Sequence, residues 1–320
     1  MRKFTHINAT SVEDAVSLLK QYSGKAKVIA GGTDLLGTMI DEIHPREAYP
    51  EVIINLKTIK PSLEYIKEEG GVLKIGALTK LYDIEVNSIV KSKYLALSQA
   101  AHAVASPHIR EMGTIGGNIC QETRCLYYRA PNNRFYCLRK GGGMCYAMSG
   151  DNRFHSIFGA VKGCIAVNPS DIAPVLIALD AKIVTSKRNI EAEKFWDVRV
   201  PGSTVLDSDE IVTEIQIPAP PAGTKSAFTK LRIRKSIDFP LVNCAALIGG
   251  NVARICLNAV YNIPYRATKA EDAIRGKTID VNTAEAAAAQ AVSGAVPLTY
   301  NRWKIQAAKG VVKKTILACK

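Results

Sequence analysis

A short apolar run that breaks into two glycines is the strongest local constraint on how this chain can fold. Residues 28–30 read Val-Ile-Ala and predict a buried strand, and Gly31-Gly32 is followed by Thr33 and Asp34, which commonly open helices. Glycines accept positive φ angles and leave backbone N–H groups uncovered, so such a turn can surround the oxygens of a phosphate. Because glycine is common in turns, the pattern also fits an ordinary tight turn.

A second glycine pair favours the phosphate interpretation. Residues 113–118 read Gly-Thr-Ile-Gly-Gly-Asn, about eighty positions after the first pair. Two Gly-Gly turns that carry hydroxyl and amide side chains could hold one diphosphate between them. The two segments therefore predict a dinucleotide site built from distant parts of the chain.

The two loops resemble those of a known family. Ala-Gly-Gly-Thr at 30–33 and Thr-Ile-Gly-Gly-Asn at 114–118 are similar to the FAD-binding loops of the flavoprotein (medium) subunits of the molybdenum hydroxylases, such as xanthine and carbon monoxide dehydrogenases. The resemblance extends along the whole chain. It implies an α+β fold, in which a two-lobed FAD-binding domain of the PCMH type precedes an α/β C-terminal domain of the carbon monoxide dehydrogenase flavoprotein type. We expect the first domain at 1–218, with lobes at about 1–60 and 61–218, and the second at 224–320.

Composition limits the classes of protein that remain. The 320 residues are 47% hydrophobic and 22% charged, which is ordinary for a soluble globular protein, and no apolar run is long enough to span a membrane. The N-terminus lacks the apolar region of a secretory signal, so we expect a cytoplasmic protein whose eight cysteines are thiols or metal ligands. The net charge is +13, but the basic residues form no long tract, so we expect an acidic partner subunit and no nucleic acid.

Hydrophobic periodicity predicts the regular elements outside the loops. We expect helices at 11–22, 81 to about 104, 283–292 and 302–318, with Pro107 ending the second of them. We expect strands at 52–56, 63–66, 72–75, 181–185, 211–217, 226–234, 242–249 and 253–260. The Pro- and Gly-rich residues 218–223 are the clearest linker.

Residues 119–165 contain five of the eight cysteines and little periodicity. An irregular segment of this length needs something to order it, and a metal centre would do so. Cys125, Cys137, Cys145 and Cys164 follow one another at 12, 8 and 19 positions, without the Cys-x-x-Cys pair typical of zinc sites. The spacing alone leaves open an iron–sulfur cluster, a zinc ion or buried free thiols.

The resemblance narrows this choice. The flavoprotein subunit of the 4-hydroxybenzoyl-CoA reductases carries an inserted loop at the same place, which binds a [4Fe-4S] cluster, and residues 121–125 of this chain are similar to the start of that loop. By position, the resemblance implies Cys125, Cys137, Cys145 and Cys164 as ligands. Cys120 matches a cysteine that is not a ligand, and it is the alternative to Cys164, because the spacing before Cys164 differs from that of the reductases.

The same resemblance implies which residues contact FAD. Backbone N–H groups and the Thr33 hydroxyl would hold the diphosphate, Asp171 would approach the ribityl or ribose hydroxyls, and Lys230 would face the isoalloxazine. Without the resemblance, Asp171 also fits a helix N-cap and Lys230 a solvated strand residue. The full expected set is Val28, Ile29, Ala30, Gly31, Gly32, Thr33, Asp34, Leu35, Val104, Thr114, Gly117, Asn118, Asp171, Val212 and Lys230.

The function implied is electron transfer, with no catalytic residue for the substrate in this chain. The resemblance implies an oxidoreductase complex with a small subunit that carries two [2Fe-2S] clusters and a large subunit that carries a molybdenum cofactor. Ferredoxin and NAD(P) are the candidate external carriers. Two alternatives from other classes are a stand-alone FAD-dependent NAD(P)H oxidoreductase and a four-cysteine zinc module that binds nucleic acid.

Overall fold

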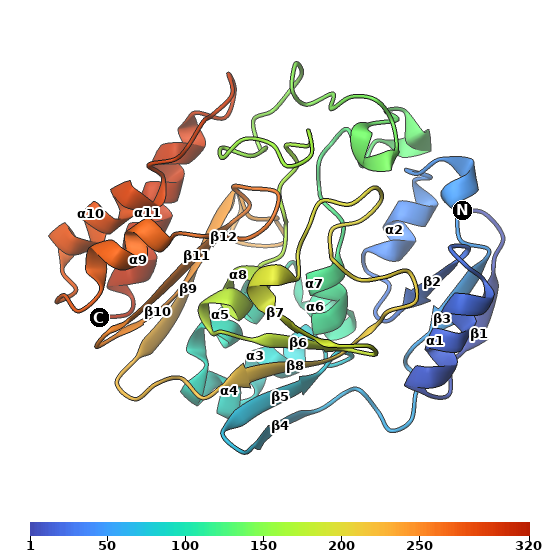
Figure 1. Cartoon of the computed structure of the whole chain (residues 1–320), viewed down its shortest axis with the longest axis horizontal. Coiled ribbons are helices and arrows are strands. Elements are labelled where there is room, and N and C mark those ends of the chain that lie inside the picture. Colours follow the sequence, from blue (N-terminus) through green and yellow to red (C-terminus); the bar gives the residue numbers. More distant parts are fainter.

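The computed structural model describes residues 1–320 and arranges them around three β-sheets (Figure 1). Figure 1 shows the N-terminal sheet with its helices at one end of the molecule and the C-terminal helices at the other, with the second sheet and its helices between them. The chain is therefore α+β, as predicted. None of its helices is both long enough and apolar enough to cross a membrane.

The first sheet is parallel, in the order β1-β3-β2, with strands Thr5–Asn8, Val52–Asn55 and Ala26–Ile29. Helix α1 (Val12–Gln21) begins where predicted, because the Ser11 hydroxyl accepts a hydrogen bond from the Asp14 N–H. Strand β2 ends directly before the first glycine pair, and α2 (Leu35–Ile40) follows it. The predicted phosphate loop thus lies at the carboxyl end of a parallel strand.

The second sheet is antiparallel, in the order β4-β5-β8-β6-β7. Its strands are Ile66–Glu69, Val72–Gly76, Val212–Pro218, Lys182–Thr185 and Asn189–Glu191. The predicted hairpin is present, but the expected strand at 63–66 was placed too early. Gly70 and Gly71 alone make the turn, both at positive φ, so Glu68 and Glu69 belong to the strand.

The long helix predicted from residue 81 is wrong, because three short helices occupy the region. They are α3 (Leu81–Val86), α4 (Ser88–Lys93) and α5 (Leu95–Ala103). The Asn87 side chain accepts hydrogen bonds from the N–H groups of Ile89 and Val90 and so starts a new helix. Pro107 also does not end a helix; it is the first residue of α6 (Pro107–Met112), which precedes α7 (Ile115–Cys120).

The third sheet is antiparallel, in the order β12-β11-β10-β9. In chain order its strands are β9 (Lys225–Leu231), β10 (Val242–Gly249), β11 (Val252–Asn258) and β12 (Tyr265–Arg266). Helices α9 (Thr268–Ile274), α10 (Val281–Ala291) and α11 (Trp303–Leu317) follow. Strands β1, β7 and β12 and helix α9 were not predicted. Between α7 and α8 (Ala173–Ala178), the chain has only two short 3-10 turns, Pro131–Asn133 and Leu138–Lys140, so the cysteine segment is irregular, as expected. Two further 3-10 turns lie at Arg46–Ala48 and Ala192–Lys194.

The third sheet is buried on both faces, which explains its nearly continuous apolar strands. Ala245 and Leu247 of β10 enter the core of the second lobe, whereas Cys244 and Ala246 enter the core under the C-terminal helices. Successive side chains of a strand point to opposite faces, so β10 joins the two cores. The C-terminal sheet is therefore fixed to the lobe that carries the second glycine loop.

Replacing Leu247 with alanine is expected to lower the free energy of unfolding of the whole chain by about 2–5 kcal/mol, because the side chain is buried in the core that the second lobe and third sheet share. Urea unfolding followed by fluorescence and circular dichroism should show one transition shifted to lower urea. Ile233→Ala is the control, because Ile233 is 74% exposed. Two separate transitions in the unsubstituted chain would contradict the shared core.

Candidate functional site

An open cleft lies between the first and second lobes. Its volume is about 1380 Å³, including the solvent-filled space at its opening. One wall is the first glycine loop with Lys27 and the residues of α2. The opposite wall is made by Thr114, Gly116 and Gly117 of the second loop and by Leu206 and residues 210–212. The two predicted loops thus face one cavity from separate lobes.

Glycine is required where the two loops meet. A Cβ atom on Gly31 would lie 2.0 Å from the Met112 carbonyl oxygen, so any other residue would push the loops apart. Gly32 has φ +72°, which side chains rarely adopt. The second glycine pair differs from the prediction, because Gly116 and Gly117 lie inside α7 rather than in a turn, and the Thr114 hydroxyl accepts the Gly117 N–H at 3.1 Å.

Asp34 does not cap α2, although it occupies the N-cap position. Its carboxylate instead accepts hydrogen bonds from Arg129 Nη2 at 2.7 Å and from the Glu122 N–H at 2.9 Å, and it pairs with Arg124 at 2.6 Å. Burial opposes ionisation of this carboxyl, but the two guanidinium groups outweigh it and hold the pKa of Asp34 below its ordinary value. Asp34 therefore ties the first glycine loop to the cysteine segment.

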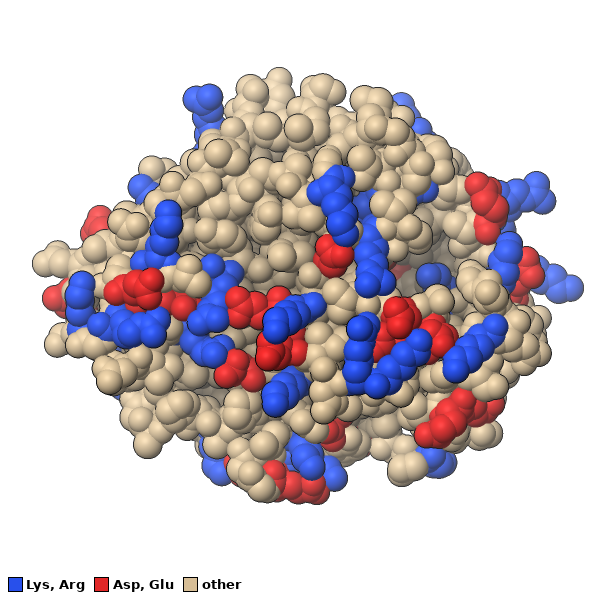
Figure 2. All heavy atoms as spheres, in the orientation of Figure 1, with Lys and Arg blue, Asp and Glu red and all other residues tan.

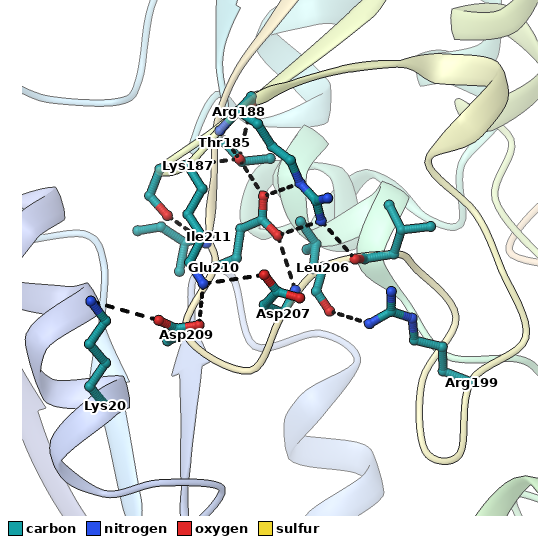
Figure 3. Close-up of polar contacts among 12 residues, drawn as sticks. Lys20, Thr185, Lys187, Arg188, Arg199, Leu206, Asp207, Asp209, Glu210 and Ile211 are labelled. Carbon is teal, nitrogen blue, oxygen red and sulfur yellow. Dashed lines mark hydrogen bonds and ion pairs between the residues drawn. The ribbon is translucent and has the colours of Figure 1, made fainter.

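A buried carboxylate also holds the loop that closes the cleft. Figure 3 shows Glu210 receiving hydrogen bonds from the Thr185 hydroxyl at 2.6 Å, from both Nε and Nη2 of Arg188, and from the Asp207 N–H. The Glu210 side chain is fully buried. In the same view, Lys20 of α1 reaches Asp209 at 3.9 Å, which links the first lobe to this loop.

The structure divides the predicted FAD residues into two groups. Residues 28–35, Thr114, Gly117 and Val212 all line the cleft. Four others do not line it, namely Val104, Asn118, Asp171 and Lys230.

The second group is joined by buried hydrogen bonds. Lys230 Nζ donates to Asp171 at 2.6 Å and to the Ala103 carbonyl, next to Val104, at 2.9 Å. Ser170 donates to the Asn118 side chain at 2.6 Å. Ser170, not Asp171, accepts the Ala173 N–H at the start of α8, and the Lys230 side chain is 3% exposed. Asp171 is therefore not an N-cap, and Lys230 is not a solvated strand residue, so both of these alternative predictions are wrong.

His44 lies in the site but was not predicted from the sequence. Its ring lines the cleft and packs edge-on against the Tyr128 ring, with 5.5 Å between the ring centroids. Burial lowers the pKa of His44 to about 4, so the imidazole is neutral at neutral pH. Gln121 and Glu122, which follow α7, also line the cleft and could have been found from their place after the second loop.

Four cysteines converge on a second cavity of about 300 Å³. They are the four predicted ligands, Cys125, Cys137, Cys145 and Cys164. The rest of the lining is mainly apolar and includes Tyr128, the partner of His44. Cys120 lies elsewhere, on the wall of the larger cleft.

Burial disfavours the thiolate at two of these cysteines. Burial raises the pKa of Cys125 to about 12 and raises that of Cys164. No group of three His, Cys, Asp or Glu side chains is placed to hold a metal ion in this structure, at this cavity or elsewhere.

Family models match both halves of the chain. Residues 2–220 match the FAD binding domain in molybdopterin dehydrogenase, and residues 226–316 match the CO dehydrogenase flavoprotein C-terminal domain. The chain belongs to the FAD-binding medium subunits of the molybdenum hydroxylase family. The resemblance inferred from the two glycine loops is therefore confirmed, as is the fold that it implied.

Curated relatives agree with this assignment. The FAD-binding subunit of an aldehyde oxidoreductase of Escherichia coli K12 is 33% identical over 282 residues, which cover 85% of this FAD-binding subunit and 86% of the relative. The FAD-subunit of nicotinate dehydrogenase of Eubacterium barkeri is 30% identical over 294 residues, covering 89% and 84%. A carbon monoxide dehydrogenase structure from Hydrogenophaga pseudoflava superposes with a TM-score of 0.76 at 28% identity, covering 99% and 97% of the two chains. The relatives are oxidoreductase subunits, as expected for this chain.

Replacing Asp34 with asparagine is expected to lower the free energy of unfolding of this FAD-binding subunit by about 1–3 kcal/mol, because Arg124 and Arg129 lose their carboxylate. Binding of FAD should weaken about tenfold, since the first loop loses its anchor. Flavin fluorescence titration and urea unfolding measure the two effects. Asp41→Asn is the control, because Asp41 at the other end of α2 is exposed, and an unchanged affinity in Asp34→Asn would contradict the anchoring role.

Glu210 predicts a pH dependence of stability. Burial opposes its ionisation, but hydrogen bonds from Arg188 and Thr185 outweigh burial and lower the pKa of Glu210 from 4.5. The unfolded chain therefore binds the proton first, so the stabilisation is complete above pH 4.5 and is lost as pH falls through the lowered pKa. Near pH 7, Glu210→Gln should be less stable than the unsubstituted chain by about 1–3 kcal/mol. Urea unfolding should show this difference shrinking toward pH 3, and a constant difference would contradict the assignment.

Proposed function

We propose that this chain is the FAD- and [4Fe-4S]-containing electron-transfer subunit of a heteromeric molybdenum-dependent hydroxylase or dehydroxylating reductase. It would pass electrons between an external carrier and subunits that hold [2Fe-2S] clusters and molybdenum. The observation that carries the proposal is that the two cavities adjoin. His44 lines the cleft, Tyr128 lines the cysteine cavity, and their rings pack edge-on against each other.

The cleft fits FAD. Glycines of both loops line it without side chains, and the Cβ of any residue replacing Gly31 would collide with Met112. We propose that residues 28–35, Thr114, Gly117 and Val212 hold the dinucleotide, and that the buried group of Val104, Asn118, Asp171 and Lys230 supports the flavin end. Bound FAD can take up two electrons and release them one at a time.

The cysteine cavity fits a cubane cluster better than one ion. A zinc ion would need four ligands within about 2.0–2.3 Å of one point, whereas each cysteine of a cubane binds a different iron and the ligands surround a cage. The four cysteines line one cavity, in a segment with only two short 3-10 turns, which supports the proposal of a cluster. We propose Cys164 rather than Cys120 as the fourth ligand, because Cys164 lines this cavity and Cys120 does not.

The surface of the cysteine segment fits a covered interface. Five large apolar side chains are exposed along it, namely Leu126, Tyr136, Met144, Met148 and Phe154. Figure 2 shows mixed charges across the middle of one face and fewer over its upper part, where Figure 1 draws part of this segment.

We propose a small subunit with two [2Fe-2S] clusters and a large molybdenum-cofactor subunit as partners in a cytoplasmic complex, with ferredoxin or NAD(P) as external carrier. The FAD-binding part would span 1–218 and the C-terminal part 224–320.

Iron analysis of the complex, purified without oxygen, tests the proposal. We expect FAD and close to four iron and four sulfide per chain beyond the content of the small subunit. Cys137→Ser should lose that iron, because it removes one of the four thiols around the cavity. Cys120→Ala is the matched control and should retain the iron. Iron-free protein that carries zinc, or rapid NADH turnover by this chain alone, would contradict the assignment and favour one of the other two classes.

A further inference from the structure

One candidate cluster ligand is in contact with a buried histidine. His155 Nε2 lies 3.1 Å from Cys125 Sγ, although the two residues are thirty positions apart. The His155 side chain is buried, and its other ring nitrogen, Nδ1, has no hydrogen-bond partner. The only polar contact of this ring is therefore the sulfur of Cys125.

This geometry determines which nitrogen carries the hydrogen once Cys125 is a thiolate. A neutral imidazole has one N–H donor and one acceptor, and a thiolate sulfur can only accept. If the hydrogen were on Nδ1, a buried donor would have no acceptor, and the lone pair of Nε2 would face the lone pairs of the sulfur. With the hydrogen on Nε2, the ring donates to the sulfur and leaves only an acceptor without a partner.

The C-terminal region fixes the backbone of this histidine. Lys304 of α11 is fully buried, and its ammonium group donates to the carbonyl groups of Phe154, His155 and Ala259 at 3.1, 3.1 and 2.6 Å. Asn301 donates to the Ser156 carbonyl at 2.8 Å. Burying an ammonium group is costly unless its hydrogen bonds are made. The Lys304 contact therefore favours the one backbone conformation at 154–156 that presents these carbonyl groups to it.

We propose that His155 donates an N–H···S hydrogen bond to Cys125 and thereby raises the reduction potential of the iron–sulfur cluster, with Lys304 holding His155 in position. The inference rests on the proposed function. A hydrogen bond to a ligand sulfur withdraws negative charge from the cluster and favours the reduced form, which carries one more electron. His155 is thus a positioning residue that acts through Cys125.

The test is the midpoint potential of this cluster in the purified holo-complex, followed by electron paramagnetic resonance during a redox titration. His155→Phe keeps a ring but removes the donor, and it should make reduction about tenfold less favourable, a fall of about 59 mV for one electron. His155→Gln can still donate and should restore most of the potential. The potential of the flavin should be the same in all three proteins.

A second pair of variants tests the part played by α11. Lys304→Met removes the donor to the His155 carbonyl and should shift the cluster potential in the same direction, by less than His155→Phe. Lys309→Met, on the same helix and not fully buried, is the matched control and should leave the potential unchanged.

The outcomes separate this inference from the proposed function. Equal cluster potentials in the unsubstituted, His155→Phe and His155→Gln proteins, each with full iron content, would overturn the inference and leave the function standing. Loss of the cluster from both His155 variants would also overturn it, because the residue would then have only a structural role. Absence of the cluster from the unsubstituted complex would overturn the proposed function itself.

Discussion

The carboxylate of Asp34 connects the two halves of the site. It does not cap the start of α2. Instead it accepts hydrogen bonds from Arg129 and from the Glu122 N–H, at the start of the cysteine segment. Arg129 in turn donates to the Thr123 carbonyl, two residues before Cys125. The position of the first cysteine therefore depends on the same side chain that positions the first glycine loop. The first glycine loop and the start of the cysteine segment are therefore built as one unit.

The same arrangement places two rings where the cleft and the cysteine cavity adjoin. Gly31 lets the first loop approach Met112 of the second lobe. The His44 ring, which lines the cleft, packs edge-on against the Tyr128 ring, which lines the cysteine cavity. Burial keeps the imidazole neutral, and the phenol is almost completely buried. The two cavities therefore adjoin through a pair of uncharged rings.

The sequence could predict the parts of the site that local patterns encode. The glycine pairs and most strands follow from residue type and spacing, because each depends on neighbours in the chain, whereas the set of four cysteines came from the family resemblance. His44, Glu210 and His155 could not be predicted, because their roles arise from contacts with residues twenty or more positions away. The long helix at 81–104 failed for a local reason, since Asn87 caps a new helix within an apolar stretch that periodicity reads as continuous. Local pattern also misled at Asp171 and Lys230, where it fits an N-cap and a solvated strand residue, because a distant ion pair buries both side chains.

The irregular cysteine segment is held from three sides, which bears on how a cluster could be inserted. Asp34 holds its beginning from the first lobe, Arg139 holds its middle through the Gly202 carbonyl and the Ser203 hydroxyl, and Lys304 holds its end from the C-terminal helix. Fixing the backbone in advance reduces the entropy that metal binding must overcome. Burial raises the pKa of Cys125 and of Cys164, so a metal centre that bound these two thiols would have to displace their protons. The structure thus explains how a segment with only two short 3-10 turns keeps four cysteines around one cavity. Its order comes from Asp34 of the first loop, from Lys304 of α11, and from its own Arg139, which donates to residues 202 and 203.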